Sequence, residues 1–168
     1  MRSQLRSRLI ASRGQSVVEF ALVLPILLIL LLGIVDLARI YTTMLTVESA
    51  AREAADYGAF GSYQWKPDVR VNTESEMKRR ACLAAKNLPD YIGPDTDCVN
   101  PTFTLAPVAA TCDNPDNDPP CDVTVTLRYD FHLLVPLNIE LFGVQYGLPS
   151  TLTFERSSTF AMSDLTLP

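Results

Sequence analysis

One carboxylate stands inside a stretch of sequence that is otherwise suited to lipid. Glu19 is the only charged residue between Gln15 and Val35. A charge at the middle of a bilayer costs on the order of 2.5–3.5 kcal/mol on insertion scales, and less near the edge. A cation that pairs with the carboxylate offsets part of that cost. The chemistry that Glu19 offers is therefore ion pairing with a neighbouring group, or, in the plainer alternative, solvation where its side chain reaches the membrane interface.

Four cysteines offer covalent cross-linking as a second kind of chemistry. All of them follow the apolar stretch, and their even number indicates an oxidising, extracytoplasmic compartment. The chain has no Cys-x-x-Cys pattern and only one histidine, His132, which argues against a zinc site. Three disulfide pairings are possible. We favour Cys82–Cys98 with Cys112–Cys121 because both bonds close short loops.

The acidic segment between the last two cysteines is a candidate for calcium. Asp113, Asp116 and Asp118 supply the hard oxygen ligands that this ion prefers. The spacing lacks the EF-hand pattern, and the prolines restrict how the segment can wrap around an ion. We therefore expect a solvated surface loop, with calcium as the weaker alternative.

No pattern in the chain predicts catalysis or a cofactor. A Gly-rich phosphate loop, Gly-x-Ser-x-Gly and His-Glu-x-x-His are all missing from the sequence. His132 has no nucleophile or paired carboxylate pattern beside it, so a structural role is expected. The sequence therefore favours a binding or assembly protein over an enzyme.

The charge of the chain is divided unequally along its length. The 168 residues carry 14 Lys and Arg against 19 Asp and Glu, for a net charge of −5. Four arginines and no acid lie within the first 13 residues, so the remainder is acidic. An acidic body argues against nucleic acid as a partner, because binding phosphate needs a basic face. The basic head is typical of a cytoplasmic flank of a membrane span.

The element that positions Glu19 is a predicted membrane helix. About 19 apolar residues at 1.5 Å each span roughly 28 Å, close to the hydrocarbon thickness of a bilayer. A buried core helix is disfavoured by the flanking charges, and a cleaved secretory signal by the poor cleavage site after Val35. We expect a single span with the amino terminus in the cytoplasm. Pro25 inside it predicts a kink.

The predicted helix continues beyond the membrane to Ala59. Ala50, Ala51, Ala54 and Ala55 give it a low-profile face for packing. Further along, residues 62–72 are expected to form a loop. A capping box at residues 73–76 predicts the start of a second helix that ends near Leu88. Strands are expected over residues 101–109, 123–131 and 151–162, the last two pairing antiparallel around a long connection.

The amino-terminal motif resembles a known processing site. Gly14 to Phe20 is similar to the cleavage site of the type IV pilin superfamily, in which a basic leader ends in Gly and Glu is the fifth mature residue. Residues 13–25 resemble the TadE-like pseudopilins of the tight-adherence (Tad, or Flp) branch. Gly33, Asp36 and the Ala-Arg-Glu-Ala-Ala run at 51–55 resemble the family's helix continuation. The strand-like segments around residues 133–137 and 142–143 resemble its carboxyl-terminal part.

This resemblance implies a function as well as a fold. A prepilin peptidase would cleave between Gly14 and Gln15, and Glu19 with Phe20 would act in recognition and assembly. The implied partners are sister pseudopilins, the major Flp pilin, the prepilin peptidase and the inner-membrane assembly platform. The chain would be a minor pseudopilin in pilus biogenesis or priming. The alternative is a single-span, membrane-anchored extracytoplasmic binding module unrelated to pili.

The expected fold class is α+β and pilin-like. A long amino-terminal helix, half in the membrane and half outside, would pack on a small antiparallel sheet with one extra helix. We expect a basic cytoplasmic leader at residues 1–14 and a transmembrane segment at 15–36. A helix continuation at 37–60 and a small extracytoplasmic domain at 61–168 would follow.

Overall fold

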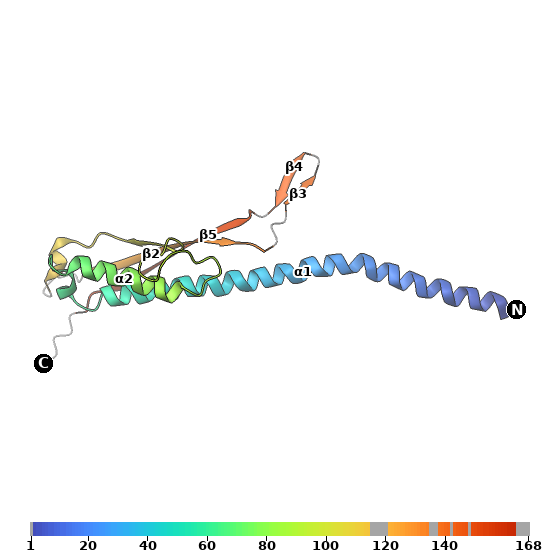
Figure 1. Cartoon of the computed structure of the whole chain (residues 1–168), viewed down its shortest axis with the longest axis horizontal. Helices are drawn as coiled ribbons and strands as arrows, with labels where there is room; N and C mark the ends of the chain where they lie inside the picture. The colour runs from blue at the N-terminus through green and yellow to red at the C-terminus, as the bar shows by residue number, and fades with distance from the viewer. Residues whose placement is uncertain (1, 115–120, 135–137, 142, 148, 164–168) are drawn as a thin grey trace. The chain divides into compact units, whose positions relative to one another are not determined.

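The structure is a computed structural model that describes residues 2–114, 121–134, 138–141, 143–147 and 149–163. The chain divides into two compact units, Met1–Arg39 and Ile40–Pro168, and each is described by itself. The elements in chain order are α1 (Arg2–Gly58), the 3₁₀ helix η1 (Ser62–Trp65), α2 (Arg70–Ala85), β1 (Thr102–Leu105), the 3₁₀ helix η2 (Ala110–Asp113), β2 (Asp122–His132), β3 (Asn138–Leu141), β4 (Val144–Gly147) and β5 (Thr151–Ala161) (Figure 1).

The first unit contains only the amino-terminal part of α1, up to Arg39. The helix begins at Arg2, within the segment expected to be a leader, and not at Gln15. Helical backbone therefore runs through Gly14 without a break. Pro25 lies inside the helix, which is visibly bent along its apolar part (Figure 1). A proline is expected to bend a helix because it lacks a backbone donor, so the kink at Pro25 stays a prediction.

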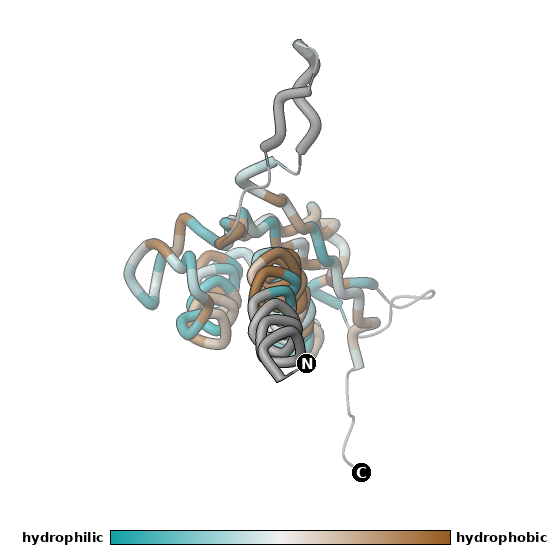
Figure 2. Tube along the Cα trace, turned by 90° about the vertical axis from the view of Figure 1, so that its right-hand side faces the viewer, coloured by the Kyte–Doolittle hydropathy of each residue, from teal (hydrophilic) through white to brown (hydrophobic). Residues whose placement is uncertain are grey.

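The second unit has its core between two helices and a sheet. The four alanines of the predicted low-profile face, Ala50, Ala51, Ala54 and Ala55, are completely buried. Small side chains let α1 approach its neighbours closely, and α2 lies beside the last turns of α1 (Figures 1 and 2). The core also contains Met77, Ala81 and Ala85 from α2, Trp65 from η1, and the inward side chains of β2, Val123, Val125, Leu127, Tyr129 and Phe131.

The sheet of the second unit is antiparallel, with the strand order β1-β2-β5. The alternation of apolar and polar residues in β2 predicted this strand, and its burial alternates in the same way. Residues of β2 pair with β5 over the whole strand, from Asp122 opposite Ala161 to His132 opposite Thr151. The predicted antiparallel pairing across a long connection is therefore confirmed.

Three expectations for the middle of the chain are wrong. Residues 62–72 are not a loop, since η1 and the first turn of α2 lie within them. The capping box does not form: α2 begins at Arg70, and the Thr73 hydroxyl instead donates to the carbonyl oxygen of Gln64 at 2.8 Å. The helix ends at Ala85, although Leu88 still reaches the core.

The connection between β2 and β5 contains a hairpin at other residues than the strand-like segments expected around 133–137 and 142–143, of which residues 135–137 and 142 lie outside the described residues. Strands β3 and β4 pair with each other, from Asn138 opposite Gly147 to Leu141 opposite Val144. Among the described residues they form a two-stranded sheet separate from β1-β2-β5. The expected α+β, pilin-like architecture as a whole is confirmed: a long amino-terminal helix, one further α-helix and a three-stranded antiparallel sheet.

Candidate processing and assembly site

The first and the fifth residue after the expected processing site, Gln15 and Glu19, are in contact. The side-chain amide of Gln15 donates a hydrogen bond to Glu19 Oε1 at 3.0 Å. The helix produces this contact because residues four apart lie on the same face, one turn from each other. Both side chains are exposed, and so is Phe20, with 66% of its surface accessible. The carboxylate of Glu19 is therefore open to a neighbouring molecule.

The segment that carries Glu19 exposes an apolar surface along α1. Residues Gln15–Gly58 include a window of mean hydropathy 2.9 that is not buried at all within the chain. It is the one helix of the described residues that is long and apolar enough to cross a membrane. Figure 2 shows the strongly hydrophobic part of α1 in brown. Burial of such a surface in lipid or against other helices is strongly favoured.

A second acid on α1 is placed differently from Glu19. Asp36 is only 6% exposed, and its carboxylate accepts a hydrogen bond from the Arg39 guanidinium at 3.1 Å. The spacing of three residues between opposite charges on a helix was the available signal for an ion pair. Asp36 is thus neutralised within the chain.

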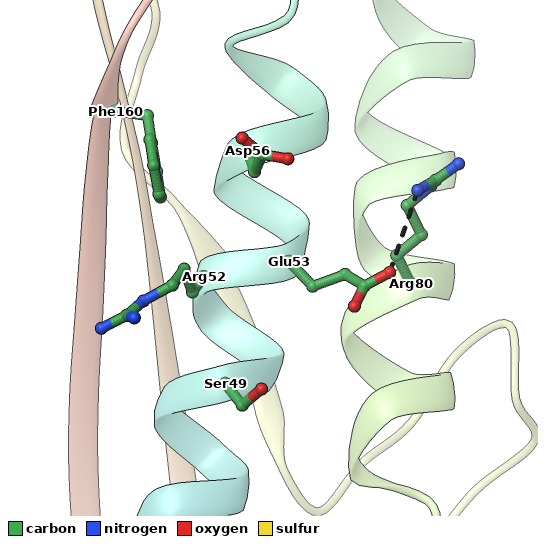
Figure 3. Close-up of a pocket in the computed structure, with 6 residues that line it drawn as sticks. All are labelled: Ser49, Arg52, Glu53, Asp56, Arg80 and Phe160. Carbon is green, nitrogen blue, oxygen red and sulfur yellow. Dashed lines mark ion pairs between the residues drawn. The ribbon is translucent and has the colours of Figure 1, made fainter.

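A shallow, charged groove runs over the outer part of α1. Ser49, Arg52, Glu53 and Asp56 of α1 line it between Arg80 of α2 and Phe160 of β5 (Figure 3). Glu53 and Arg80 approach to 3.9 Å across it. The guanidinium of Arg80 also stacks over the ring of Tyr57, 4.3 Å from its centroid. Opposite charges neutralise each other here, which suits polar recognition and does not provide a nucleophile with an adjacent base.

The cysteines form two disulfides, Cys82–Cys98 and Cys112–Cys121. The first joins α2 to the loop before β1. The second joins η2 to the residue before β2. These are the two short-loop pairings favoured from the sequence. The structure thus closes the acidic segment by a covalent bond at its base.

The candidate calcium ligands are only partly within the described structure. Asp113 ends η2 and is half-buried. Asp116 and Asp118 lie outside the described residues. Within the described part of the chain, no group of three His, Cys, Asp or Glu side chains is arranged to hold a metal ion.

His132 lies at the end of β2 with its side chain exposed, and its partner is Asp90. One oxygen of Asp90 accepts a hydrogen bond from the His132 backbone N–H at 2.8 Å, and the other lies 3.5 Å from the imidazole Nδ1. The carboxylate thereby caps the end of the strand. This contact gives Asp90 and His132 a structural role in the sheet.

The long amino-terminal helix, the second helix and the small antiparallel sheet define a pilin-like α+β protein. Glu19 is the exposed acid within the apolar part of α1. Residues 14–56 match the family model described as TadE-like protein, so this part of the chain is TadE-like. The match supports a protein associated with the Tad pilus, and the family is structural. Searches of curated proteins and of solved structures gave no match.

Proposed function

We propose that this protein is a minor pseudopilin of a Tad (Flp) pilus assembly apparatus, cleaved by a prepilin peptidase between Gly14 and Gln15. The observation that carries the proposal is the exposed carboxylate of Glu19, one helical turn after Gln15 on an apolar helix. The TadE-like match supports it because this match begins at Gly14, the residue before the proposed cut.

Cleavage creates the cation that Glu19 needs. The new amino group of Gln15 is an ammonium ion near neutral pH. In an assembly, the ammonium of one subunit pairs with Glu19 of its neighbour within apolar surroundings, where opposite charges attract more strongly than in water. Desolvation offsets much of this gain, but loss of one partner costs about 3–5 kcal/mol because the other remains buried and unpaired. The pair therefore selects correctly registered neighbours more than it adds stability.

The same proposal gives each part of the chain a place. Residues 1–14 form a basic leader in the cytoplasm, and residues 15–36 span the inner membrane, as the arginine-rich flank favours. Residues 37–60 continue the helix outside, and residues 61–168 complete the extracytoplasmic domain. The two disulfides support an oxidising location for that domain.

The proposed partners are other pilus components within and above the membrane. The apolar face of α1 would pack against the corresponding helices of sister pseudopilins and of the major Flp pilin. The prepilin peptidase and the membrane assembly platform would act on the chain before assembly.

The experiment compares a deletion strain complemented with the wild-type chain, with Glu19→Ala or with Glu48→Ala. Glu48 is a matched control because it is an acid on the same helix whose ion pair with Arg52 is solvent-exposed. The proposal predicts that deletion abolishes surface pili, that Glu48→Ala restores them and that Glu19→Ala does not. Pili that persist after deletion would instead indicate a membrane-anchored binding module unrelated to pili.

A further inference from the structure

The contact between Gln15 and Glu19 bears on the stability of the amino terminus that cleavage at Gly14 would create, and the inference rests on that proposed cleavage. An amino-terminal glutamine can cyclise without any cofactor or oxidant. Its uncharged α-nitrogen attacks the side-chain Cδ, a new N–Cδ bond forms, the Cδ–Nε2 bond breaks and ammonia leaves. The product is a five-membered lactam, pyroglutamate, whose nitrogen carries no positive charge.

The observed hydrogen bond of the Gln15 amide competes with this ring closure. Gln15 Nε2, the nitrogen that would leave, is hydrogen-bonded to Glu19 Oε1 at 3.0 Å. Glu19 lies one turn further toward the carboxyl end of α1. The contact therefore holds the end of the Gln15 side chain beside Glu19. Cyclisation requires Cδ to approach the residue's own backbone nitrogen.

We propose that Glu19 protects the mature amino terminus by holding the Gln15 side-chain amide in a hydrogen bond that competes with ring closure. Glu19 is a positioning residue in this role, in addition to its proposed pairing with a neighbouring subunit. The two roles support each other. A cyclised terminus has lost the ammonium, so the Glu19 of the neighbouring subunit would be buried without a cation.

The test measures the rate of cyclisation in the mature full-length chain. Wild type, Glu19→Leu and Glu19→Gln are extracted from membranes in detergent and incubated near neutral pH. Trypsin releases the peptide Gln15–Arg39, and mass spectrometry quantifies the fraction that has lost ammonia. A hydrogen bond between helix residues four apart predicts about a twofold faster rate in Glu19→Leu. Glu19→Gln is expected to restore a rate near that of wild type, because its amide oxygen still accepts the bond.

The outcomes separate this inference from the function on which it rests. A mature chain that does not begin at Gln15 overturns the proposed processing, and the protection with it. A chain that begins at Gln15 but cyclises at the same rate in wild type and Glu19→Leu overturns the protection alone. A slower rate in Glu19→Leu does so too, because Glu19 would then assist departure of ammonia.

A variant that the peptidase does not process is tested by a second route. The full-length chain is made with the recognition site of a specific protease placed directly before Gln15. Cleavage in detergent then produces the same amino terminus in every variant, independently of the prepilin peptidase. The rates from this route are expected to show the same order, and equal rates overturn the protection.

Discussion

The side chain of Asn100 pairs with the backbone of Asp130 in the way that a neighbouring strand would. Its Nδ2 donates to the Asp130 carbonyl oxygen at 2.9 Å, and its Oδ1 accepts from the Asp130 N–H at 3.0 Å. The same Nδ2 donates to the Asp90 carbonyl oxygen at 2.6 Å. Strand β1 pairs with β2 only as far as Arg128, opposite Thr102. Asn100 therefore continues the closed edge of the sheet beyond the end of β1.

Replacement of Asn100 by alanine is predicted to destabilise the outer domain strongly. The residue is only 9% exposed, and its loss removes three part-buried hydrogen bonds to the backbone of Asp90 and Asp130. Each such hydrogen bond contributes about 0.5–1.5 kcal/mol, so we expect a total of about 2–4 kcal/mol. Denaturant unfolding followed by circular dichroism measures the change. Asn72→Ala is the matched control, because Asn72 is exposed on α2. Equal stabilities of the two variants would contradict this account of the sheet edge.

Gly58→Ala is predicted to destabilise the junction of α1, α2 and β2. A Cβ at this position would lie 2.7 Å from the Met77 Sδ and Cε atoms and 3.0 Å from Val123 Cγ1. The methionine end can move, but the valine is held in the sheet, so overpacking costs about 1–2 kcal/mol. Gly33→Ala is the control on the same helix, since its new Cβ meets no atom within 4 Å. Thermal unfolding should show a lower midpoint for Gly58→Ala alone. An unchanged midpoint would mean that Met77 and Val123 leave room for a methyl group at position 58.

Glu76 gives the stability of α2 a dependence on pH. Hydrogen bonds from Arg79, opposed by partial burial and assisted by Arg80, hold the pKa of the Glu76 carboxyl below its ordinary value of 4.5. A depressed pKa in the folded state stabilises the fold above pH 4.5, and this contribution is lost as the pH falls through the folded pKa.

The corresponding experiment compares the unfolding of wild type and Glu76→Gln between neutral pH and pH 2. The advantage of wild type should be largest at neutral pH and should disappear below the folded pKa. Ser75→Ala, a neighbouring exposed position without a titrating group, should differ from wild type by the same amount at every pH. A wild-type advantage that grows in acid would contradict the assigned direction of the pKa.

The Cys82–Cys98 disulfide is predicted to contribute more stability than Cys112–Cys121. It closes the longer loop, with 16 residues of separation against 9, and Cys82 is completely buried on α2. Loop closure entropy alone gives about 2–4 kcal/mol for such bonds, and the buried sulfurs add packing. Paired Cys→Ala replacements, one pair at a time, are compared by denaturant unfolding. A larger loss for Cys112–Cys121 would show that the closed acidic loop is the more important constraint.

The parts of the fold predicted from sequence are those with a regular burial pattern. The alternation in β2 and the alanine face of α1 each reflect one surface buried against one core, so their periods show directly in the sequence. The predicted start of α2 was wrong because the Thr73 hydroxyl donates a hydrogen bond to the Gln64 carbonyl oxygen. This contact joins two elements, so a local capping pattern cannot predict it. The role of Asn100 likewise depends on a strand 30 residues further along.

The sequence predicted the acid of the candidate site, Glu19, but not the charged groove on the outer part of α1. Glu19 was found because a single charge in an apolar run is visible in any reading of the chain. The contact from Gln15 also follows from a spacing of four residues on a helix. The groove between Phe160 and Arg80 was missed because α1, α2 and β5 meet there only in the folded domain. Its residues are ordinary surface charges in the sequence.

The mass of the mature amino terminus tests the central claim most directly. Protein extracted from membranes of cells with an active prepilin peptidase is digested and its first peptide identified by mass spectrometry. The account predicts a chain that begins at Gln15, as the free amine or its lactam, and retention of Gly14 when the peptidase is deleted. A chain that begins at Met1, or at any residue beyond Val35, would contradict it.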